Sequence, residues 1–129
     1  MAGDSERTTL NQFNNAVRTE TSAIQVNGSG TNTVTTVTEY TYDDNQQLIE
    51  EKRDATYGNP SKTITSYTKY SYNGNGDVVR TESYVDGEEY KTGKNIQETF
   101  YDKQGRAVKT VTYNTLETAF VLMCELGCN

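Results

Sequence analysis

The sequence contains no histidine and no tryptophan, one proline, and two cysteines that both lie in its last six residues. Without histidine there is no histidine-based catalytic triad, no imidazole acid–base catalysis and no histidine-ligated metal. Cys124 and Cys128 supply only two of the four ligands that a zinc site needs. A disulfide-stapled domain would distribute its cysteines through the fold, so we expect reduced or tail-to-tail thiols, with an intermolecular crosslink as the alternative.

Long apolar runs and clusters of basic residues are also missing. No apolar run approaches the roughly 18 residues of a membrane-spanning helix, and the first twenty residues contain no apolar segment of a secretory signal. The net charge is −6, and the lysines and arginines are scattered among acids. Because phosphate binding needs clustered basic residues, we expect no nucleic-acid partner. Because no apolar run is long enough, we expect no membrane insertion.

Paired acids are present but lie in an unsuitable context for catalysis. They occur at Asp43–Asp44, Glu50–Glu51 and Glu88–Glu89. Adjacent residues of a strand point to opposite faces, so such pairs cannot act as the two carboxylates of a glycosidase. The run 73–77 is similar to a calcium loop, but that motif requires glycine and glutamate where Val78 and Tyr84 stand. We therefore expect no enzymatic activity, no metal and no cofactor.

The residues that are abundant favour β-structure. Only 33% of the residues are apolar, while ten tyrosines and many threonines supply much of the side-chain volume. Both residue types suit a half-buried pleated surface. A chain of 129 residues with so few apolar side chains has a thin core. Neighbouring copies of a structural unit, or other chains, would then help to complete it.

One short phrase recurs at a nearly constant spacing. It reads YTYDDNQQLIEE from Tyr40, YSYNGNGDVVRTE from Tyr70 and TFYDKQGRAVKTV from Thr99. The steps between the aligned aromatic residues are 72 − 42 = 30 and 101 − 72 = 29 residues. A weaker fourth copy, LNQFNNAVRTE, places Leu10 at the tyrosine position, 42 − 10 = 32 residues earlier. A fixed period of this size indicates a repeat architecture.

Each phrase predicts a β-hairpin whose turn is rich in Asn, Asp and Gly, the residues that tolerate positive φ. Further reversals are expected at 27–30, 58–60, 86–87 and 92–94, with no helix between them. Strict alternation places Tyr40 with Tyr42, and Tyr70 with Tyr72, on one sheet face. The sequence therefore predicts an all-β, open curved antiparallel meander of roughly seven strands.

The last sixteen residues have a different character. Asn114 and Glu117 form a capping-box-like start, and apolar residues then recur at helical spacing as far as Leu126. This pattern predicts a short C-terminal helix, with a strand through 120–123 as the alternative. We accordingly divide the chain into an N-terminal extension (1–9), four hairpin repeats (10–113) and an apolar tail (114–129).

The repeated phrase resembles the YD repeat, also called the RHS repeat, which reads Tyr-Asp, two spacers, Gly, an Arg-like residue and then aliphatic residues. The third copy, with Tyr101, Asp102, Gly105 and Arg106, fits almost throughout. The second copy retains Tyr72 and Gly76 but has Asn and Asp for Asp and Arg. The copy at Tyr42–Asp43 has lost the glycine. The resemblance covers about residues 10–113.

This resemblance implies stacked hairpins in a protein that is exported or displayed at the cell surface, as in bacterial Rhs proteins, toxin-complex components and teneurins. The shells of that family enclose a cavity, but four repeats are too few to do so. We expect a piece of a longer bacterial protein that acts as a structural or adhesion module through its sheet edges. Partners would be further repeats or other copies.

Two alternatives remain open. One is a self-assembling extracellular filament or oligomer subunit. The other is a carbohydrate-binding module that uses exposed tyrosines, with surface glycans as its ligands. Tyr67, Tyr84 and Tyr90 lie outside the repeated phrase and are the candidate ligand-binding residues.

Overall fold

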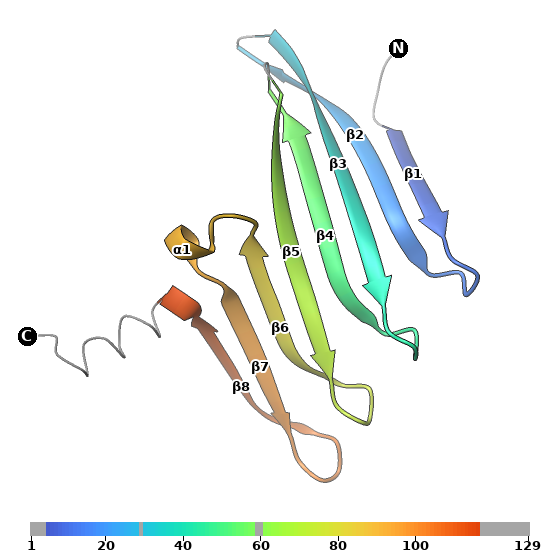
Figure 1. The fold of residues 1–129 in the computed structure, drawn as a ribbon, viewed down its shortest axis with the longest axis vertical. Coiled ribbons are helices and arrows are strands. Elements are labelled where there is room, and N and C mark those ends of the chain that lie inside the picture. Colours follow the sequence, from blue (N-terminus) through green and yellow to red (C-terminus); the bar gives the residue numbers. More distant parts are fainter. Residues whose placement is uncertain (1–4, 29, 59–60, 117–129) are drawn as a thin grey trace, which may run out of the picture. The chain divides into compact units, whose positions relative to one another are not determined.

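A computed structural model describes residues 5–28, 30–58 and 61–116 of the chain. The described residues form eight strands and one four-residue helix (Figure 1). The elements are β1 (Ser5–Leu10), β2 (Ala16–Asn27), β3 (Gly30–Tyr42), β4 (Leu48–Tyr57), β5 (Lys62–Tyr72), β6 (Val78–Val85), α1 (Glu89–Thr92), β7 (Asn95–Tyr101) and β8 (Ala107–Asn114). The strands follow one another in sequence order, β1 to β8, in one sheet. The predicted all-β, open antiparallel meander is confirmed.

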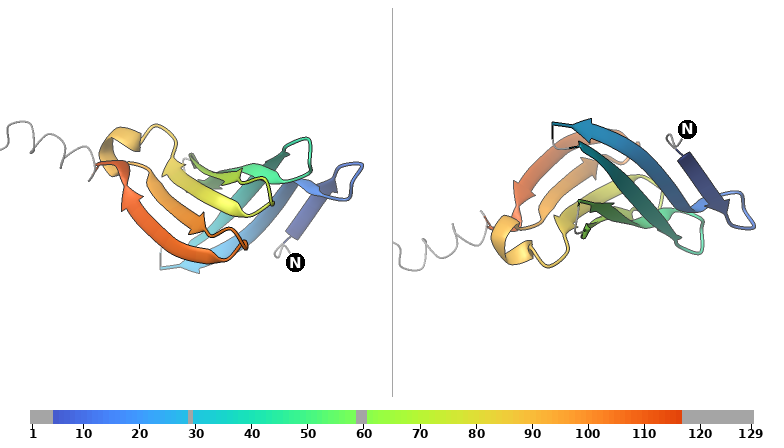
Figure 2. Two further views of the ribbon diagram at one scale, coloured as in Figure 1. Left: turned by 90° about the horizontal axis from the view of Figure 1, so that it is seen from below. Right: turned by 90° about the horizontal axis from the view of Figure 1, so that it is seen from above.

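The chain divides into two compact units, Met1–Ser66 and Tyr67–Asn129. In the first unit, β2 pairs with β1 on one side and with β3 on the other, and β3 pairs with β4. In the second unit, β7 pairs with β6 and β8, and β7 and β8 are bent along their length (Figure 2). All of these pairs are antiparallel.

Strand β1 is an addition to the predicted count of about seven strands. It lies mostly within the segment that the sequence suggested was an extension, and it pairs with β2 from Ser5↔Ser22 to Leu10↔Ala16. All six of its residues are exposed. Because β1 buries no apolar face, its sequence carries little of the alternation by which a strand is recognised.

Helix α1 also departs from the sequence interpretation, which placed no helix between β6 and β7. Its short length gave no periodic signal, because four residues complete barely one turn. Glu88 and Glu89 therefore lie at the start of a helix and not on a strand. The argument that adjacent strand residues face opposite ways does not apply to this pair.

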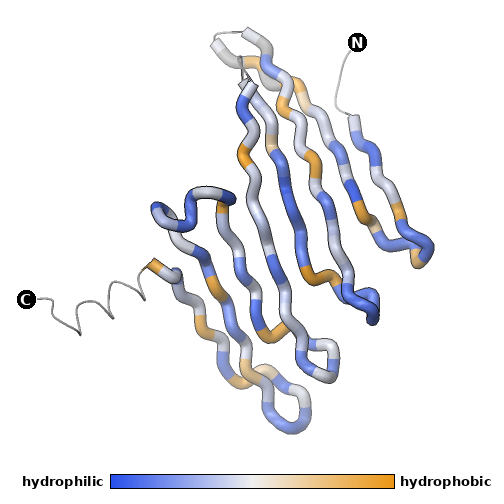
Figure 3. The backbone as a smooth tube through the Cα atoms, in the orientation of Figure 1, coloured by the Kyte–Doolittle hydropathy of each residue, from blue (hydrophilic) through white to orange (hydrophobic). Residues whose placement is uncertain are grey.

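Burial is slight throughout the described residues. Ile96, in β7, is their one buried apolar residue, with an exposed fraction of 1%. Apolar residues stand singly or in pairs among polar ones along the strands (Figure 3). Cross-strand pairs and backbone hydrogen bonds must then supply much of the stability of such a sheet. The thin core expected from the composition is what the structure has.

At the C-terminal end, Thr115 and Leu116 are helical, and the Asn114 side chain accepts the Leu116 N–H at 2.9 Å. This agrees with a helix beginning after Asn114. The remainder of the predicted helix, its strand alternative, Cys124 and Cys128 lie outside the described residues. No helix in the described part of the chain is long and apolar enough to cross a bilayer.

Candidate functional site

The four turns that carry the repeated phrase share one hydrogen-bond pattern. Each begins at Asn or Asp, whose side-chain oxygen accepts the backbone N–H groups two and four residues later, at 2.8–3.1 Å. The same residue's carbonyl accepts the N–H three residues on, and its own N–H donates to the carbonyl four residues on. These residues are Asn11, Asp43, Asn73 and Asp102. The four turns are therefore geometrically equivalent, including the first, whose sequence match is weakest.

The third residue after this Asn or Asp has positive φ in every copy. Gly76 and Gly105 have φ of 86° and 82°, and Asn14 and Gln46 have 64° and 61°. Glycine adopts this conformation without strain, and asparagine tolerates it better than most residues. Gln46 is the exception, and it has a local compensation. Its side-chain oxygen accepts the amide N–H of Asn15 at 3.0 Å, joining neighbouring turns within the first unit.

Two of the repeat tyrosines, one in each unit, connect their hairpin to the one before it. The Tyr42 hydroxyl donates to the carbonyl of Ala16 at 2.7 Å, and the Tyr101 hydroxyl donates to the carbonyl of Val78 at 3.1 Å. Both acceptors are the first strand residue after the preceding turn. Burial is the main cause that raises the pKa of Tyr42, followed by nearby Tyr40 and Glu51. The hydroxyl therefore remains a donor well above neutral pH.

Two of the three candidate ligand-binding tyrosines pack against each other. The rings of Tyr67 (β5) and Tyr84 (β6) stack with centroids 5.3 Å apart and planes inclined by 27°. Lys94 lies 4.6 Å from the Tyr84 ring centroid and forms an ion pair with Glu82 at 3.0 Å. Lys69 lies 5.5 Å from the same ring. Much of the contact capacity of this pair is used within the protein.

Tyr90 is placed differently from the other two. It lies on α1, its exposed fraction is 72%, and its ring contacts Lys91 at 5.4 Å. The structure does not bring Tyr90 into the Tyr67–Tyr84 stack. Of the three candidates, Tyr90 presents the most accessible ring to a ligand.

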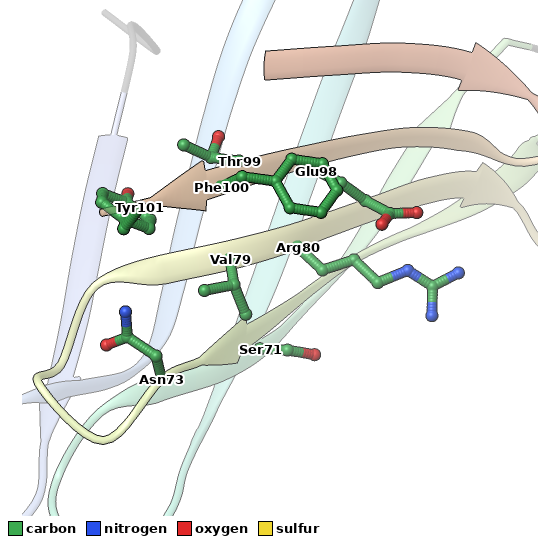
Figure 4. A pocket seen from close by; sticks show the side chains of 8 residues that line it. All are labelled: Ser71, Asn73, Val79, Arg80, Glu98, Thr99, Phe100 and Tyr101. Carbon is green, nitrogen blue, oxygen red and sulfur yellow. The ribbon is translucent and has the colours of Figure 1, made fainter. Parts of the chain in front are cut away.

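Sequence reasoning missed an open pocket of about 450 Å³ in the second unit. The Phe100 ring, with an exposed fraction of 48%, lies beside Glu98 of its own strand and Arg80 of β6 (Figure 4). The remaining lining residues are Ser71, Asn73, Val79, Thr99 and Tyr101. The lining residues come from β5 and the turn after it, from β6 and from β7, so spacing along the chain gives no direct signal for the pocket.

Strand β8 is tied to β7 at this site. The Tyr113 hydroxyl donates to the Glu98 carboxylate, and this hydrogen bond is the main cause that raises the pKa of Tyr113. Within the described residues, no group of three or more carboxylate or thiol side chains is arranged to hold a metal ion. What the site offers is therefore an aromatic surface with charged neighbours and a set of backbone edges.

Comparison with known proteins gives no relative from which a function could be transferred. No family model, no curated protein and no solved structure matches the chain.

Proposed function

We propose that this chain is a non-enzymatic structural and adhesion module, of the kind found in secreted or surface proteins of bacteria. It works by stacking equivalent β-hairpins into one sheet and by pairing further strands at the edges of that sheet. The shared geometry of the four turns carries this proposal. A turn that is formed by its own side chain repeats without help from a neighbouring layer, which suits a unit built to be added in series.

The inter-hairpin tyrosines support the same function. The bonds from Tyr42 to Ala16 and from Tyr101 to Val78 do not lie within a single repeat but join successive repeats. A phenol that reaches a backbone carbonyl on the preceding hairpin fixes the distance and register between units. The same contact can be formed again wherever another hairpin is added.

The outer strands favour extension. β1 and β8 lie at the two ends of the strand order in the described part of the sheet. Five of the eight β8 residues are exposed, as is the whole of β1. An edge strand presents backbone N–H and C=O groups that a further strand can pair. Because the core is thin, such pairing is favourable: each added hairpin covers the exposed edge strand of the hairpin next to it.

A test is to add one repeat to the full chain. A second copy of residues 87–115, which spans one period of 115 − 87 + 1 = 29 residues, is inserted between Thr115 and Leu116. If the sheet extends, the added hairpin folds against β8. The β8 amides then gain protection in hydrogen exchange, and the denaturant m-value rises with the extra buried surface.

The matched control inserts the same twenty-nine residues in scrambled order, which keeps composition, charge and length. We expect no added protection and no change in m-value from this insert. If the ordered repeat behaved like the scrambled one, the proposed mode of extension would be wrong.

Carbohydrate binding is a second candidate, favoured by the half-exposed Phe100 ring beside Arg80 and Glu98 and by the exposed Tyr90. Aromatic rings stack on sugar faces while charged groups bind the hydroxyls. Binding on a glycan panel should be weakened by Phe100→Ala or Tyr90→Ala. It should survive in the Tyr57→Ala control, which removes an exposed ring outside this region.

A further inference from the structure

Successive hairpins meet where β2 pairs with β3 in the first unit and where β6 pairs with β7 in the second. At each of these two junctions an arginine lies directly opposite a glutamate. Arg18 of β2 lies opposite Glu39 of β3, and Arg80 of β6 lies opposite Glu98 of β7. Opposite charges at directly facing positions favour strand pairing, and like charges oppose it. The two junctions therefore have the same charge pattern.

The two pairs also occupy the same place in the repeat. Each arginine is the second residue after the residue whose carbonyl accepts the tyrosine hydroxyl, Ala16 or Val78. Each glutamate is the third residue before that tyrosine. At these two junctions the following strand thus carries Glu-x-x-Tyr, in which the glutamate lies opposite an arginine in the strand register and the tyrosine hydroxyl donates to a carbonyl.

Strand β8, the last strand of the described part of the sheet, repeats the receiving half of this pattern. Ala107 is its first residue after the turn, as Ala16 and Val78 are in β2 and β6. Lys109 stands two residues later, where the other strands have arginine, and it is exposed. Within its own hairpin Lys109 lies opposite Phe100, with its ammonium nitrogen 5.9 Å from the ring centroid, so an acid that faces Lys109 across a strand pair would come from the other side of β8.

The outer strand β1 does not supply the matching half. If a second copy stacked head to tail in the same register, Leu10 would take the place of the tyrosine and Arg7 the place of the glutamate. Leu10 has no hydroxyl to donate, and Arg7 would face Lys109. A second copy is therefore a poor occupant of the β8 edge, because like charges oppose each other there.

We propose that the β8 edge is a docking site for an antiparallel strand with the sequence Glu-x-x-Tyr, whose glutamate pairs with Lys109 and whose hydroxyl donates to the Ala107 carbonyl. This inference rests on the proposed function and adds to it the chemistry of the partner. The edge selects a further repeat of matched charge and rejects another copy of this chain.

The test uses the inserted copy of residues 87–115. Its connection to β8 has the same length as the connection between β6 and β7, so the copy of Glu98 comes to lie opposite Lys109. Changing the inserted copy of Glu98 to lysine should lower the protection of the β8 amides about tenfold, since an attraction becomes a repulsion. Adding Lys109→Glu to that variant should restore the protection, and Lys109→Glu alone should lower it.

The four charge combinations separate the two proposals. Equal protection in all four would mean that the edge takes strands without regard to charge, which overturns the docking rule and leaves sheet extension standing. Absence of protection in all four would remove sheet extension itself. If either substitution simply unfolded the protein, the doubly changed protein would also lack protection. Rescue by the charge swap therefore excludes a general loss of folding.

A second measurement uses copies of the uninserted chain. Leu10→Tyr together with Lys109→Glu gives β1 a hydroxyl and turns the Arg7–Lys109 repulsion into an attraction. Sedimentation should then show concentration-dependent assembly that the wild-type chain lacks. The matched control, Leu10→Tyr with Lys109→Arg, keeps the repulsion and should remain unassembled. Wild-type assembly as strong as that of the charge-matched variant would contradict the rule.

Discussion

The turns after β1, β3, β5 and β7 are alike, whereas the connections after β2, β4 and β6 all differ. In the first set, four turns repeat the same hydrogen bonds around Asn or Asp. In the second set, Asn27 pairs with Gly30, four residues separate the end of β4 from the start of β5, and α1 lies between β6 and β7. The repeat is therefore maintained by one set of connections, and the other set is free to diverge.

The physical reason lies in where each connection obtains its hydrogen bonds. A repeat turn is satisfied by a side chain within it, as at Asp43. The α1 connection depends on residues far along the chain. The Asn114 amide donates to the Thr92 carbonyl, and the Thr115 N–H donates to the Lys94 carbonyl. Local turns can be copied as units, whereas a connection held by distant partners is specific to its place.

The largest expected effect is at Gly93, in the α1 connection. Its φ of 69° is accessible to few residues, and an added Cβ would lie 2.2 Å from the Asn114 side-chain oxygen. Gly93→Ala should lower the free energy of unfolding by about 3 kcal/mol, because backbone strain and a steric clash add together. Urea unfolding measures the loss.

Gly28→Ala is the matched control, since a Cβ there meets nothing within 4 Å and φ is not positive. It should change stability by less than about 0.5 kcal/mol. Equal losses at both glycines would mean that the α1 connection is no more constrained than the connection between β2 and β3.

The second-largest loss of stability is expected at Gly105, where a substitution changes only the strain of the backbone in a repeat turn. Gly105 has φ of 82° and open space around its Cβ position. Gly105→Val should cost about 2 kcal/mol, because a β-branched residue is strained at positive φ. Gly74→Val, in the equivalent turn of another copy but without positive φ, should cost much less. Thermal unfolding of the two variants, compared at one pH, shows whether the positive φ alone explains why residue 105 is glycine.

Removing the side chain that organises a turn should have a smaller effect. Asp43→Ala loses the acceptor for the N–H groups of Asn45 and Gln47, each bonded at 2.9 Å. We expect a loss of about 1–2 kcal/mol in the free energy of unfolding. Asp43→Asn should be nearly neutral, because Asn11 and Asn73 form the same bonds in their own turns. A large loss in the Asn variant would show that charge, and not the acceptor geometry, stabilises the turn.

Acid should separate the aspartate turns from the asparagine turns. Hydrogen bonds from the Arg106 backbone, and then from its side chain and neighbouring amides, lower the pKa of Asp102 below its ordinary value near 3.8. The charged form is thus favoured in the folded state. Its contribution is present above pH 3.8 and is lost as pH falls through the lower folded value. NMR of the Arg106 amide should follow this loss, while the Asn15 amide, which donates to Asn11 in an asparagine turn, shows no such titration.

Much of the sheet was predictable because its signals are local. The turn residues and the alternation of Thr and Tyr place β3 to β6 within a few residues of their observed bounds. The Tyr67–Tyr84 stack and the Phe100 pocket were not predictable, because each needs the register between two strands. Helix α1 was missed for a related reason, since its surroundings are fixed by Asn114 and Thr115 from the other end of the unit.

The smallest expected effect, at Gln46, tests whether the repeat turns are independent of one another. Gln46→Gly removes strain at φ 61° but loses the side-chain oxygen that binds Asn15. The two terms are each about 1 kcal/mol and oppose each other, so the net change should be within about 0.5 kcal/mol. Asn15→Ala, measured in the wild type and in the Gln46→Gly variant, isolates the contact. A cost in the wild type that disappears in the Gln46→Gly background would mean that neighbouring turns are coupled through this glutamine. Equal costs in the two backgrounds would mean that each turn is stabilised only by its own residues.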